Sequence, residues 1–478
     1  MTPYATVDRK CDYVHDNIIA DIMIDREVER AWLEERLATD DRQLLVLYGR
    51  RRVGKTTLVS DVLDDCGLTS VYYLCDQRGI DHNARAFARA CTATLDDVPP
   101  AVDDFTDAFT YLTRRVDGPF VVALDEFSYL VETDDTITSV FQRIVDETLA
   151  GTEISLVLLG SSISMMEEGV LSYESPLYGR RTGQWRLEPL TLGQAAGFFP
   201  AYDAEELIRA YGAVGGIPAY LEQFEPERSF ADNVETHILS KGSFLFEEPE
   251  FLLRQELREP GTYLSILEAI AHGATRVSEI ANEIDRDASS LSGYLGNLSR
   301  LGLIDRETPV TDPDARGVYR LTDHFLRFWF RYVLPNRGTL ERGQTTAVRA
   351  SIMETLPSHT SWTFEAVCRQ AVRSSGVPVG CDRVGRWWYD DNEIDVVGVN
   401  AGTETLLLGE CKWTVEPVGR DLLVDLETLG PDVRWRGEDR TVQYALFARA
   451  GFTEGLMAVA DERDDLFLAT PADILDLF

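Results

Sequence analysis

The stretch Gly49-Arg50-Arg51-Arg52-Val53-Gly54-Lys55-Thr56-Thr57 follows the apolar run Leu44–Tyr48 and precedes the apolar helix start Leu58-Val59. It matches the pattern GxxxxGK[ST], in the strand–loop–helix order that this pattern requires. Its glycines let successive backbone N–H groups turn onto a phosphate, at a helix N-terminus whose dipole favours anions. In such a loop we expect Lys55 to reach the β and γ phosphates and Thr56 to bind Mg²⁺. The stretch therefore predicts a phosphate site at the end of a buried strand.

A second apolar run, Phe120–Leu124, ends in the two carboxylates Asp125 and Glu126. We expect Asp125, at the strand tip, to hold the Mg²⁺ shell and Glu126 to polarise the attacking water. A further apolar run ends in Ser161-Ser162, which are either sensors of the γ phosphate or ordinary loop serines.

Length and apolar patterning divide the 478 residues of this α/β chain into four stretches. Residues 18–190 alternate short apolar runs with amphipathic helical patterns, which predicts a buried, mostly parallel sheet. Residues 191–258 have a helical pattern. Residues 261–335 combine three short helical patterns with a β-like turn region, and residues 350–478 combine a helix, several strands and a last α/β portion.

Three further segments accompany the phosphate-binding loop: Ile24-Asp25-Arg26-Glu27-Val28-Glu29-Arg30, Leu177–Thr182 and Gly215-Gly216-Ile217-Pro218. Together with the loop, they resemble the archaeal-type P-loop ATPases of the AAA+/STAND group. In that group an xRExEL segment packs near the adenine, and the proline of a GGxP segment in a helical lid borders the base. The resemblance implies ATP binding with Mg²⁺-dependent hydrolysis, by a core at 18–190 and a lid at 191–258. It also implies that Arg180 or Arg181 supplies charge to the transferred phosphoryl group, the alternative being a surface ion pair.

The pattern of residues 261–335 is typical of a winged helix. The helical patterns Tyr263–Ala271, Val277–Ile284 and Ala288–Leu301 are followed by Gly302, which ends the third helix before a hairpin. Such a module places its third helix in the major groove of double-stranded DNA. Two acids at the start of this helix make its footprint only weakly basic, so DNA contact and a structural or protein-binding role both stand as interpretations. The polar and basic residues of the footprint are Arg286, Ser289, Ser290, Ser292, Asn297 and Arg300.

Residues 350–478 contain a hairpin whose first strand begins with Asp395 and whose second strand ends in Glu410-Cys411-Lys412. Residues two apart on a strand share a face, so Glu410 and Lys412 point together, with Asp395 opposite. In metal-assisted phosphodiester cleavage, Asp395 and Glu410 would hold Mg²⁺ and Lys412 would orient the water. The arrangement resembles the PD-(D/E)xK nuclease fold, which implies a smaller α/β nuclease-like domain with Glu365 as the fold's first acidic residue. The alternatives are a nuclease-derived domain retained for binding and a salt-bridged strand pair.

The chain is strongly acidic, with 46 Lys and Arg against 81 Asp and Glu and a net charge of −35. Only Lys10, Lys55, Lys241 and Lys412 are lysines. This balance resembles proteins of extreme halophiles, whose carboxylates hold hydrated salt; an Arg-favouring, GC-rich genome is the other explanation. In molar salt the screening length falls to about 3 Å, so the acidity excludes no nucleic-acid partner. Two of the four lysines fall in the two predicted sites, where a compact point charge is needed.

The cysteines and histidines show no CxxC, HxxxH or mixed grouping, which disfavours disulfide frameworks and zinc sites. The N-terminus lacks the apolar core of a signal peptide, and no apolar run approaches a membrane span, so we expect a soluble cytoplasmic protein without a membrane partner. The order of modules resembles archaeal ATPases that carry a C-terminal nuclease-like domain. It implies an ATP-driven switch that acts on nucleic acid; the alternative is a regulatory ATPase whose inactive C-terminal fold binds protein partners. An oligomer is compatible with either interpretation.

Overall fold

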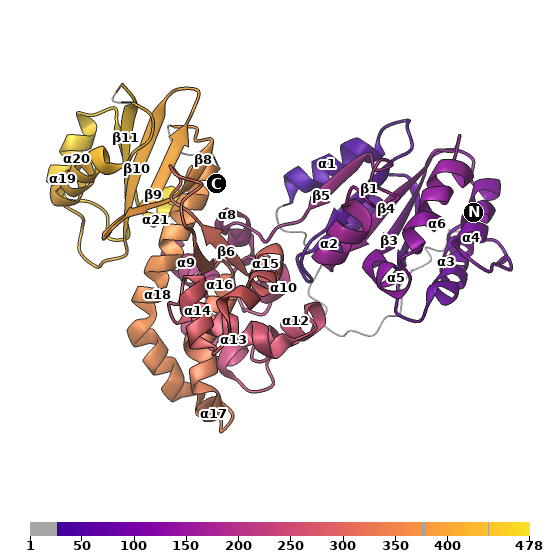
Figure 1. The fold of residues 1–478 in the computed structure, drawn as a ribbon, viewed down its shortest axis with the longest axis horizontal. Coiled ribbons are helices and arrows are strands. Elements are labelled where there is room, and N and C mark those ends of the chain that lie inside the picture. Colours follow the sequence, from indigo (N-terminus) through magenta and orange to yellow (C-terminus); the bar gives the residue numbers. More distant parts are fainter. Residues whose placement is uncertain (1–25, 375–378, 438) are drawn as a thin grey trace, which may run out of the picture.

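The computed structural model describes residues 26–374, 379–437 and 439–478. Two five-stranded sheets form the N-terminal and C-terminal parts of the molecule, and helices occupy the region between them (Figure 1). The start of the predicted core, residues 18–25, lies outside the described residues, and so do Ile24 and Asp25 of the xRExEL-like segment.

The N-terminal sheet has the strand order β2-β3-β4-β1-β5, and all neighbouring strands in it are parallel. Its central strands are buried along their whole length, as continuous apolar runs between two helical layers must be. The predicted parallel sheet of a P-loop fold is thus confirmed. The edge strand β5 escapes prediction because its sequence, Gly-Gln-Trp-Arg, contains no apolar run. The strands are β1 (Leu44–Tyr48), β2 (Thr69–Leu74), β3 (Phe120–Asp125), β4 (Ile154–Gly160) and β5 (Gly183–Arg186).

Helices cover both faces of this sheet. Alternate residues of β1 contribute to two different apolar clusters: Leu45 and Leu47 pack with α1 and α2, whereas Leu44 and Val46 pack with the layer of α3 to α6 (Figure 1). The segments are α1 (Glu27–Leu37), α2 (Lys55–Asp65), α3 (Ile80–Thr94), α4 (Phe105–Arg115), α5 (Phe127–Thr133), α6 (Ile137–Arg143), η1 (Ile144–Thr148), α7 (Ile163–Met165) and η2 (Met166–Leu171).

The next region is helical, as its pattern predicts. Asp203 caps α9 by accepting a hydrogen bond from the Glu206 N–H, and Gly215, at φ +68°, ends that helix. Pro218 then occupies the first turn of α10, where its missing N–H costs nothing. The segments are α8 (Leu192–Ala195), η3 (Ala196–Phe198), α9 (Ala204–Val214), α10 (Pro218–Leu221), α11 (Phe230–Asn233), η4 (Val234–Leu239) and α12 (Glu248–Glu256).

The middle module contains helices followed by the antiparallel strand pair β6 and β7. The predicted single helix Ala288–Leu301 is corrected by the structure, which divides it into a 3-10 turn and α15, with Leu291 between them. The Ser-rich start explains the division, since serine side chains compete for backbone hydrogen bonds. The segments are α13 (Pro260–Ala271), α14 (Val277–Glu283), η5 (Ala288–Ser290), α15 (Ser292–Arg300), β6 (Ile304–Glu307), β7 (Val318–Leu321), α16 (His324–Phe328), η6 (Trp329–Val333), η7 (Leu334–Asn336) and α17 (Arg337–Leu340).

The C-terminal sheet is mixed, with the order β12-β11-β10-β9-β8. β8, β9 and β10 are antiparallel neighbours, whereas β10, β11 and β12 are parallel neighbours. The 29-residue helix α18 begins at Thr345, before the expected domain start at 350, and contacts both α9 and strands β8 to β10. The segments are α18 (Thr345–Arg373), β8 (Arg383–Tyr389), β9 (Asn392–Asn400), β10 (Thr405–Lys412), α19 (Arg420–Leu429), η8 (Gly430–Asp432), β11 (Thr441–Ala448), α20 (Glu454–Asp461), β12 (Leu466–Ala469) and α21 (Pro471–Leu475).

One buried apolar cluster passes through most of the molecule. It includes Leu47 of the N-terminal sheet, Ile217 of the helical region that follows, Leu298 of the middle module and Phe364 of α18. The four stretches seen in the sequence therefore all contribute to one shared cluster, while two further clusters lie within the N-terminal and the C-terminal parts.

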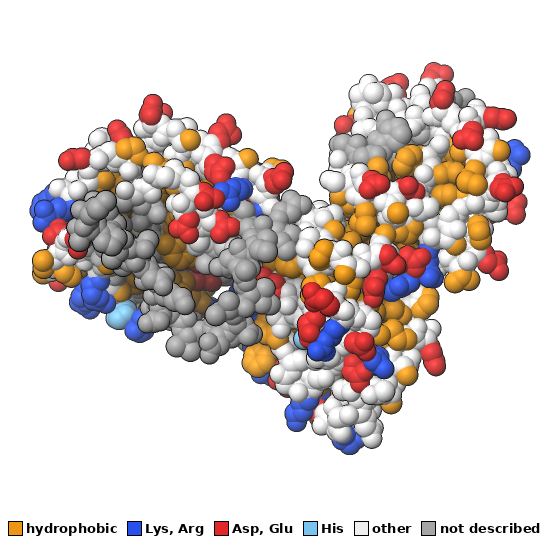
Figure 2. All heavy atoms as spheres, turned by 180° about the vertical axis from the view of Figure 1, so that it is seen from behind, with side chains coloured by type: hydrophobic (Ala, Val, Ile, Leu, Met, Phe, Trp, Pro, Cys, Tyr) orange, Lys and Arg blue, Asp and Glu red, His pale blue; other side chains and the backbone are white. Residues whose placement is uncertain are grey.

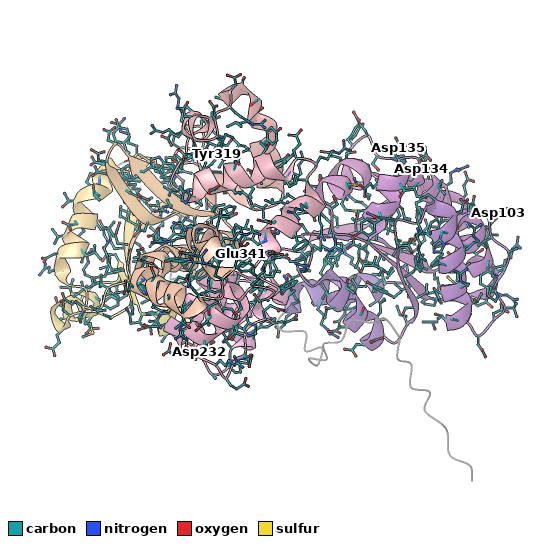
Figure 3. All side chains as sticks on the ribbon, turned by 90° about the horizontal axis from the view of Figure 1, so that it is seen from below. Asp103, Asp134, Asp135, Asp232, Tyr319 and Glu341 are labelled. Carbon is teal, nitrogen blue, oxygen red and sulfur yellow. The ribbon has the colours of Figure 1, made fainter. Side chains whose placement is uncertain are left out.

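On the face shown in Figure 2, acidic side chains are spread over both the N-terminal and the C-terminal parts and do not gather in one patch. Asp103, Asp134 and Asp135 lie at the outer end of the N-terminal part, and Asp232 and Glu341 lie on the helical middle (Figure 3). Within the described residues, no helix combines the length and the apolar character needed to cross a membrane.

Candidate functional site

The phosphate-binding loop joins β1 to α2, as predicted. Gly54 precedes α2 at φ +95°, a conformation that glycine adopts without strain, and a Cβ at Gly49 would lie 2.4 Å from the Leu187 carbonyl oxygen. Lys55 is buried, and its Nζ donates to the carbonyl oxygens of Gly49 and Arg50, each at 3.0 Å. Burial lowers the pKa of Lys55, although Glu126 and Asp125 oppose this effect. The lysine is thus folded back on a loop whose shape requires both glycines.

The structure brings Thr56 and Asp125 together. The Thr56 hydroxyl donates to Asp125 Oδ2 at 2.7 Å, and Asp125 is 3% exposed at the end of β3. The hydroxyl of Tyr72, on the adjacent strand β2, donates to the same carboxylate oxygen. Burial, and then Asp125, raise the pKa of the Tyr72 phenol, so Tyr72 stays a neutral donor. Tyr72 is missed by sequence reasoning because its strand partner is identified only by the sheet order.

Glu126 lies next to this pair in a left-handed backbone conformation, at φ 52°. Its carboxylate accepts hydrogen bonds from the Ser161 hydroxyl and, at 3.3 Å, from the Ser161 N–H. A non-glycine residue in this region of backbone space is held there by its surroundings, and such positions are frequent at functional sites. Ser161, at the tip of β4, therefore orients Glu126, while Ser162 directly precedes α7.

The three loop arginines point towards the helical regions. Arg50 Nη1 lies 2.6 Å from Asp323 Oδ2, and both side chains are buried. Arg51 donates to Gln255 Oε1 at 3.3 Å, and Arg52 forms an ion pair with Glu248. These contacts tie the phosphate-binding loop to α12 and to the residue that caps α16.

The carboxyl group of Glu256, at the end of α12, faces the same loop. Burial, opposed by the charges of Arg50, Arg51 and Lys55, raises its pKa to about 7. A titratable acid at this position sits within the electrostatic field of the phosphate-binding loop.

The GGIP segment lies beside the loop. Pro218 Cγ is 3.8 Å from the position that a Cβ on Gly54 would take, and a Cβ on Gly216 would lie 1.9 Å from the Leu190 carbonyl oxygen. Gly215, Gly216 and Ile217 line a cavity of about 480 Å³ together with Arg50 and Asp323. The glycine pair is thus required by a close backbone approach, which sets Pro218 against the loop.

The described part of the xRExEL-like segment also contacts the loop. Arg26 Nη2 donates to the carbonyl oxygens of Val53, at 3.0 Å, and Glu188, at 2.8 Å. Arg26 Nη1 donates to Glu29 Oε1 at 2.9 Å.

Arg180 and Arg181 are held away from the loop. Arg180 forms an ion pair with Asp146, at 3.0 Å, while Arg181 donates to the backbone oxygens of Leu171 and Tyr178 and lies over the Tyr178 ring. Within the described part of the chain, the polar contacts of these two arginines reach no residue of the phosphate-binding loop.

The C-terminal residues Asp395, Glu410, Lys412 and Glu365 come together from β9, β10 and α18. Lys412 Nζ donates to Glu410 Oε2 at 2.9 Å, and Asp395 Oδ2 accepts from the Cys411 N–H at 3.1 Å. Burial, and then the charge of Asp395, raise the pKa of Glu365 and of Glu410. The three carboxylates of the predicted constellation are therefore close together and largely buried, whereas the Lys412 side chain is partly exposed.

Two arginines that sequence reasoning missed lie among these acids. Arg386 Nη2, on β8, is 3.1 Å from Glu365 Oε2 and 4.0 Å from Asp395 Oδ1, and Arg369 Nη1 donates to the Asp395 backbone oxygen at 2.8 Å. Across the described ranges, no group of three or more His, Cys, Asp or Glu residues is arranged to hold a metal ion. The C-terminal constellation therefore combines carboxylates with guanidinium groups and does not consist of carboxylates and Lys412 alone. For Arg386, the one sequence signal is an arginine before two tryptophans in a strand.

The footprint of the predicted third helix is divided between two environments. Ser289, Ser290 and Ser292 are exposed, whereas Arg300 forms an ion pair with Glu168 of the N-terminal domain. Arg186 Nη2 also donates to the Arg300 carbonyl oxygen, at 3.0 Å. Two other footprint side chains have partners within the module: Asn297 donates to Tyr263 and Arg286 donates to Thr262.

Comparisons with known families agree with two parts of this description. Residues 23–224 match a family described as an ATPase domain predominantly from Archaea. Residues 329–420 match a family described as archaeal and bacterial proteins of unknown function. "Uncharacterized protein MJECL04" of Methanocaldococcus jannaschii is 35% identical over 425 residues, which are 86% of this chain and 93% of that protein.

Solved structures give weaker similarities. The Walker-type ATPase PABY2304 of Pyrococcus abyssi is 22% identical, with a TM-score of 0.47, over 65% of this chain and 96% of that chain. The ORC2 protein of Aeropyrum pernix, in ADPNP and ADP complexes, is 14% identical, with a TM-score of 0.41, over 70% of this chain and 98% of that chain.

Proposed function

The chain belongs to the same family as the Methanocaldococcus jannaschii protein and carries an archaeal-type ATPase domain, and from this premise we propose that it hydrolyses ATP with Mg²⁺ at the phosphate-binding loop. The observation that carries the proposal is the hydrogen bond from Thr56 to Asp125 below the loop. A hydroxyl and a carboxylate at this distance are the hard oxygen donors that suit Mg²⁺. When bound, Mg²⁺ neutralises charge on the β and γ phosphates.

The residues of the chain divide the remaining work. The N–H groups of residues 49–57 cradle the phosphates, and Lys55 exchanges its two carbonyl partners for phosphate oxygens. Glu126, oriented by Ser161, accepts a proton from the attacking water. Pro218 borders the base. Arg180 or Arg181 supplies charge to the phosphoryl group once a movement, or a second copy of the chain, brings it to the loop.

Lys55→Ala tests this assignment, with Lys241→Ala as a matched control because Lys241 is an exposed lysine outside the loop. We expect Lys55→Ala to lose binding of labelled ATP and to lower phosphate release at least about 100-fold. Lys241→Ala should leave both unchanged. Parent-like ATP binding by Lys55→Ala would refute the assignment of the loop.

The proposal extends to nucleic acid. Residues 261–335 serve as a winged helix and residues 350–478 as a PD-(D/E)xK-like domain, and the state of the nucleotide repositions both. The contacts of Arg50, Arg51 and Arg52 with the helical regions support this coupling, because they join the phosphate-binding loop directly to α12 and α16. Double-stranded DNA is the partner that such modules suit.

A second function is favoured by one observation, the position of Arg386 between Glu365 and Asp395. A regulatory ATPase with an inactive nuclease-like domain would need no metal ion here, and a guanidinium among the acids suits such a domain. Incubation of the full chain with plasmid DNA, Mg²⁺ and ATP at high salt separates the two functions. Cleavage that is lost in Asp395→Ala supports a nuclease; no cleavage, with Asp395→Ala equal to the parent, supports the regulatory function.

A further inference from the structure

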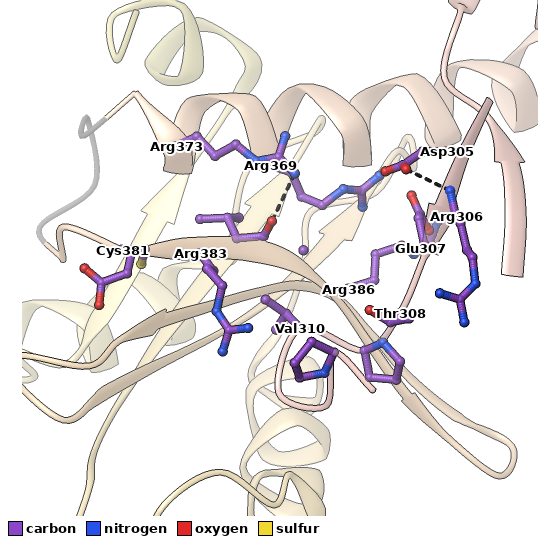
Figure 4. Close-up of a pocket in the computed structure, with 15 residues that line it drawn as sticks. Asp305, Arg306, Glu307, Thr308, Val310, Arg369, Arg373, Cys381, Arg383 and Arg386 are labelled. Atoms are coloured by element: carbon purple, nitrogen blue, oxygen red, sulfur yellow. Dashed lines mark hydrogen bonds between the residues drawn. The ribbon is translucent and has the colours of Figure 1, made fainter. Parts of the chain in front are cut away.

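A cavity of about 530 Å³ lies where the middle module meets the C-terminal domain (Figure 4). The loop after β6 forms one wall, the end of α18 forms the second and β8 forms the third. The Val310 N–H donates to the Arg386 carbonyl oxygen at 2.9 Å, so the loop and the strand are joined beside the cavity. The cavity is distinct from the phosphate-binding loop, none of whose residues line it.

The lining of this cavity is rich in arginine. Five of its 15 residues are arginines and three are acids, in a chain whose net charge is −35. The acids also contact groups other than the floor arginines: Glu307 pairs with Arg320, Asp382 accepts from the Ala401 N–H, and Asp305 accepts from the Arg306 N–H. The arginines are Arg306, Arg369, Arg373, Arg383 and Arg386.

Arg386, at the floor of the cavity, contacts the carboxylates of Glu365, Glu393 and Asp395 through Nη2 and keeps two other donors without a partner in the described part of the chain. Arg386 is only 7% exposed, and its Nε and Nη1 have no hydrogen-bond partner among the described residues. Arg369, 6% exposed, lies close enough to Arg386 that this second charge, after burial, lowers its pKa. A buried donor without a partner and crowded like charges are both relieved by an anion.

We propose that this arginine cavity binds a phosphodiester group of a nucleic-acid strand. Guanidinium groups present paired N–H donors that match the oxygens of phosphate. Arg306, Arg373 and Arg383 lie at the rim, where a strand reaches them from solvent, and Arg369 and Arg386 lie at the floor. Because Arg386 also contacts Glu365, the bound group sits next to the C-terminal carboxylates. The inference rests on the nucleic-acid role proposed above and names the site that performs it.

The test uses the full chain with Lys55→Ala, so that the phosphate-binding loop contributes no phosphate binding. Anisotropy of a labelled 20-base-pair duplex, in EDTA, gives Kd for this chain and for Arg373→Gln/Arg383→Gln in the same background. We expect the pocket variant to bind at least about 10-fold more weakly, because each lost phosphate contact removes a charge-assisted hydrogen bond. Arg420→Gln/Arg434→Gln is the matched control, because it removes the same charge from exposed positions of the same domain, and we expect a change below 2-fold.

Further arms decide between the remaining outcomes. Arg373 donates to the Val384 carbonyl oxygen, so Arg383→Gln alone serves as the variant that leaves this bond intact. Equal duplex affinity in the pocket and control variants would overturn the inference while leaving the nucleic-acid role in place. No duplex binding by any chain would overturn both. Pyrophosphate binding that depends on Arg383, without duplex binding, would assign the cavity to a free phosphate ligand and overturn the nucleic-acid assignment.

Discussion

The phosphate-binding loop and the C-terminal constellation use the same kinds of residue, a lysine beside carboxylates, yet they hold the carboxylates differently. Asp125 accepts from the neutral hydroxyls of Thr56 and Tyr72, while the loop's arginines turn away to the helical regions. Glu365 and Asp395, in contrast, lie within 4.0 Å of the Arg386 guanidinium.

The difference concerns which charge remains to be satisfied. A carboxylate held by hydroxyls keeps its negative charge and attracts a cation. The charge of a carboxylate beside a guanidinium is partly balanced, and the unused donors of that guanidinium can bind an anion. The carboxylate of the phosphate-binding loop would therefore attract a metal cation together with a nucleotide. The arginines beside the C-terminal carboxylates would instead attract a phosphate group.

Glu126→Gln gives the largest effect expected at the first site. The amide keeps the size of the side chain but cannot accept a proton from water, so hydrolysis should fall about 1000-fold while ATP binding persists. Phosphate release and binding of labelled ATP measure the two quantities. Glu132→Gln, at an exposed position of α5, should match the parent. Hydrolysis within a few-fold of the parent in Glu126→Gln would show that another group activates the water.

Asp323→Asn tests whether the ion pair between Arg50 of the phosphate-binding loop and Asp323, the cap of α16, stabilises the fold. It keeps the cap of α16 but leaves Arg50 buried without an opposite charge, so the free energy of unfolding should fall by about 3 kcal/mol. Chemical denaturation measures this change. Glu404→Gln, in the exposed pair with Arg436, should cost less than about 1 kcal/mol. An equal loss in the free energy of unfolding in the two variants would contradict a special stabilising role of the Arg50–Asp323 pair.

His359→Gln examines the contact between α18 and α9. His359 Nε2 lies 2.8 Å from the Gly212 oxygen, and burial lowers the pKa of the imidazole to about 3. In the unfolded chain the His359 imidazole is protonated below about pH 6.5, whereas in the folded chain it stays neutral. The free energy of unfolding therefore falls as the pH drops below that value. Between pH 7 and pH 5 this loss is about 2 kcal/mol, and His359→Gln should lose about that much less than the parent. Parallel denaturation curves at both pH values decide; the same pH loss in both proteins would exclude His359 as the cause.

Arg180→Ala gives the smallest expected change in stability. The ion pair with Asp146 is about one-third exposed on both sides, so the free energy of unfolding should change by less than about 1 kcal/mol. Thermal unfolding measures this change, and Arg181→Ala provides the neighbouring comparison. A larger loss would mean that Arg180 has a structural role beyond its surface pair.

The sequence predicts well what is local and predicts poorly what depends on distant partners. The loop from Gly49 to Thr57 and the apolar runs of β1, β3 and β4 carry their own signals, so the parallel sheet follows from them. Tyr72 and Arg386 do not, because only the strand order sets one beside Asp125 and the other beside Glu365.

The carboxylates of the candidate sites were identifiable by type and spacing, but what neutralises them was not. Asp323 shows the same limit: 273 positions separate it from Arg50 along the chain, yet they form one buried pair. The residue pattern of one segment cannot predict a pair such as Arg50 and Asp323, because the two residues meet only when distant segments pack together.

Helix α18 has a practical consequence for anyone who wishes to dissect the protein. Its first half buries Val348, Ile352 and Leu356 in the apolar cluster shared with residues 191–258, and its second half packs against the C-terminal sheet. Dividing the chain at residue 350 would expose apolar surface on both fragments, and such surface promotes aggregation. An exchange of C-terminal domains between relatives would keep this apolar surface buried if the joint falls before Thr345 and the incoming helix packs against α9.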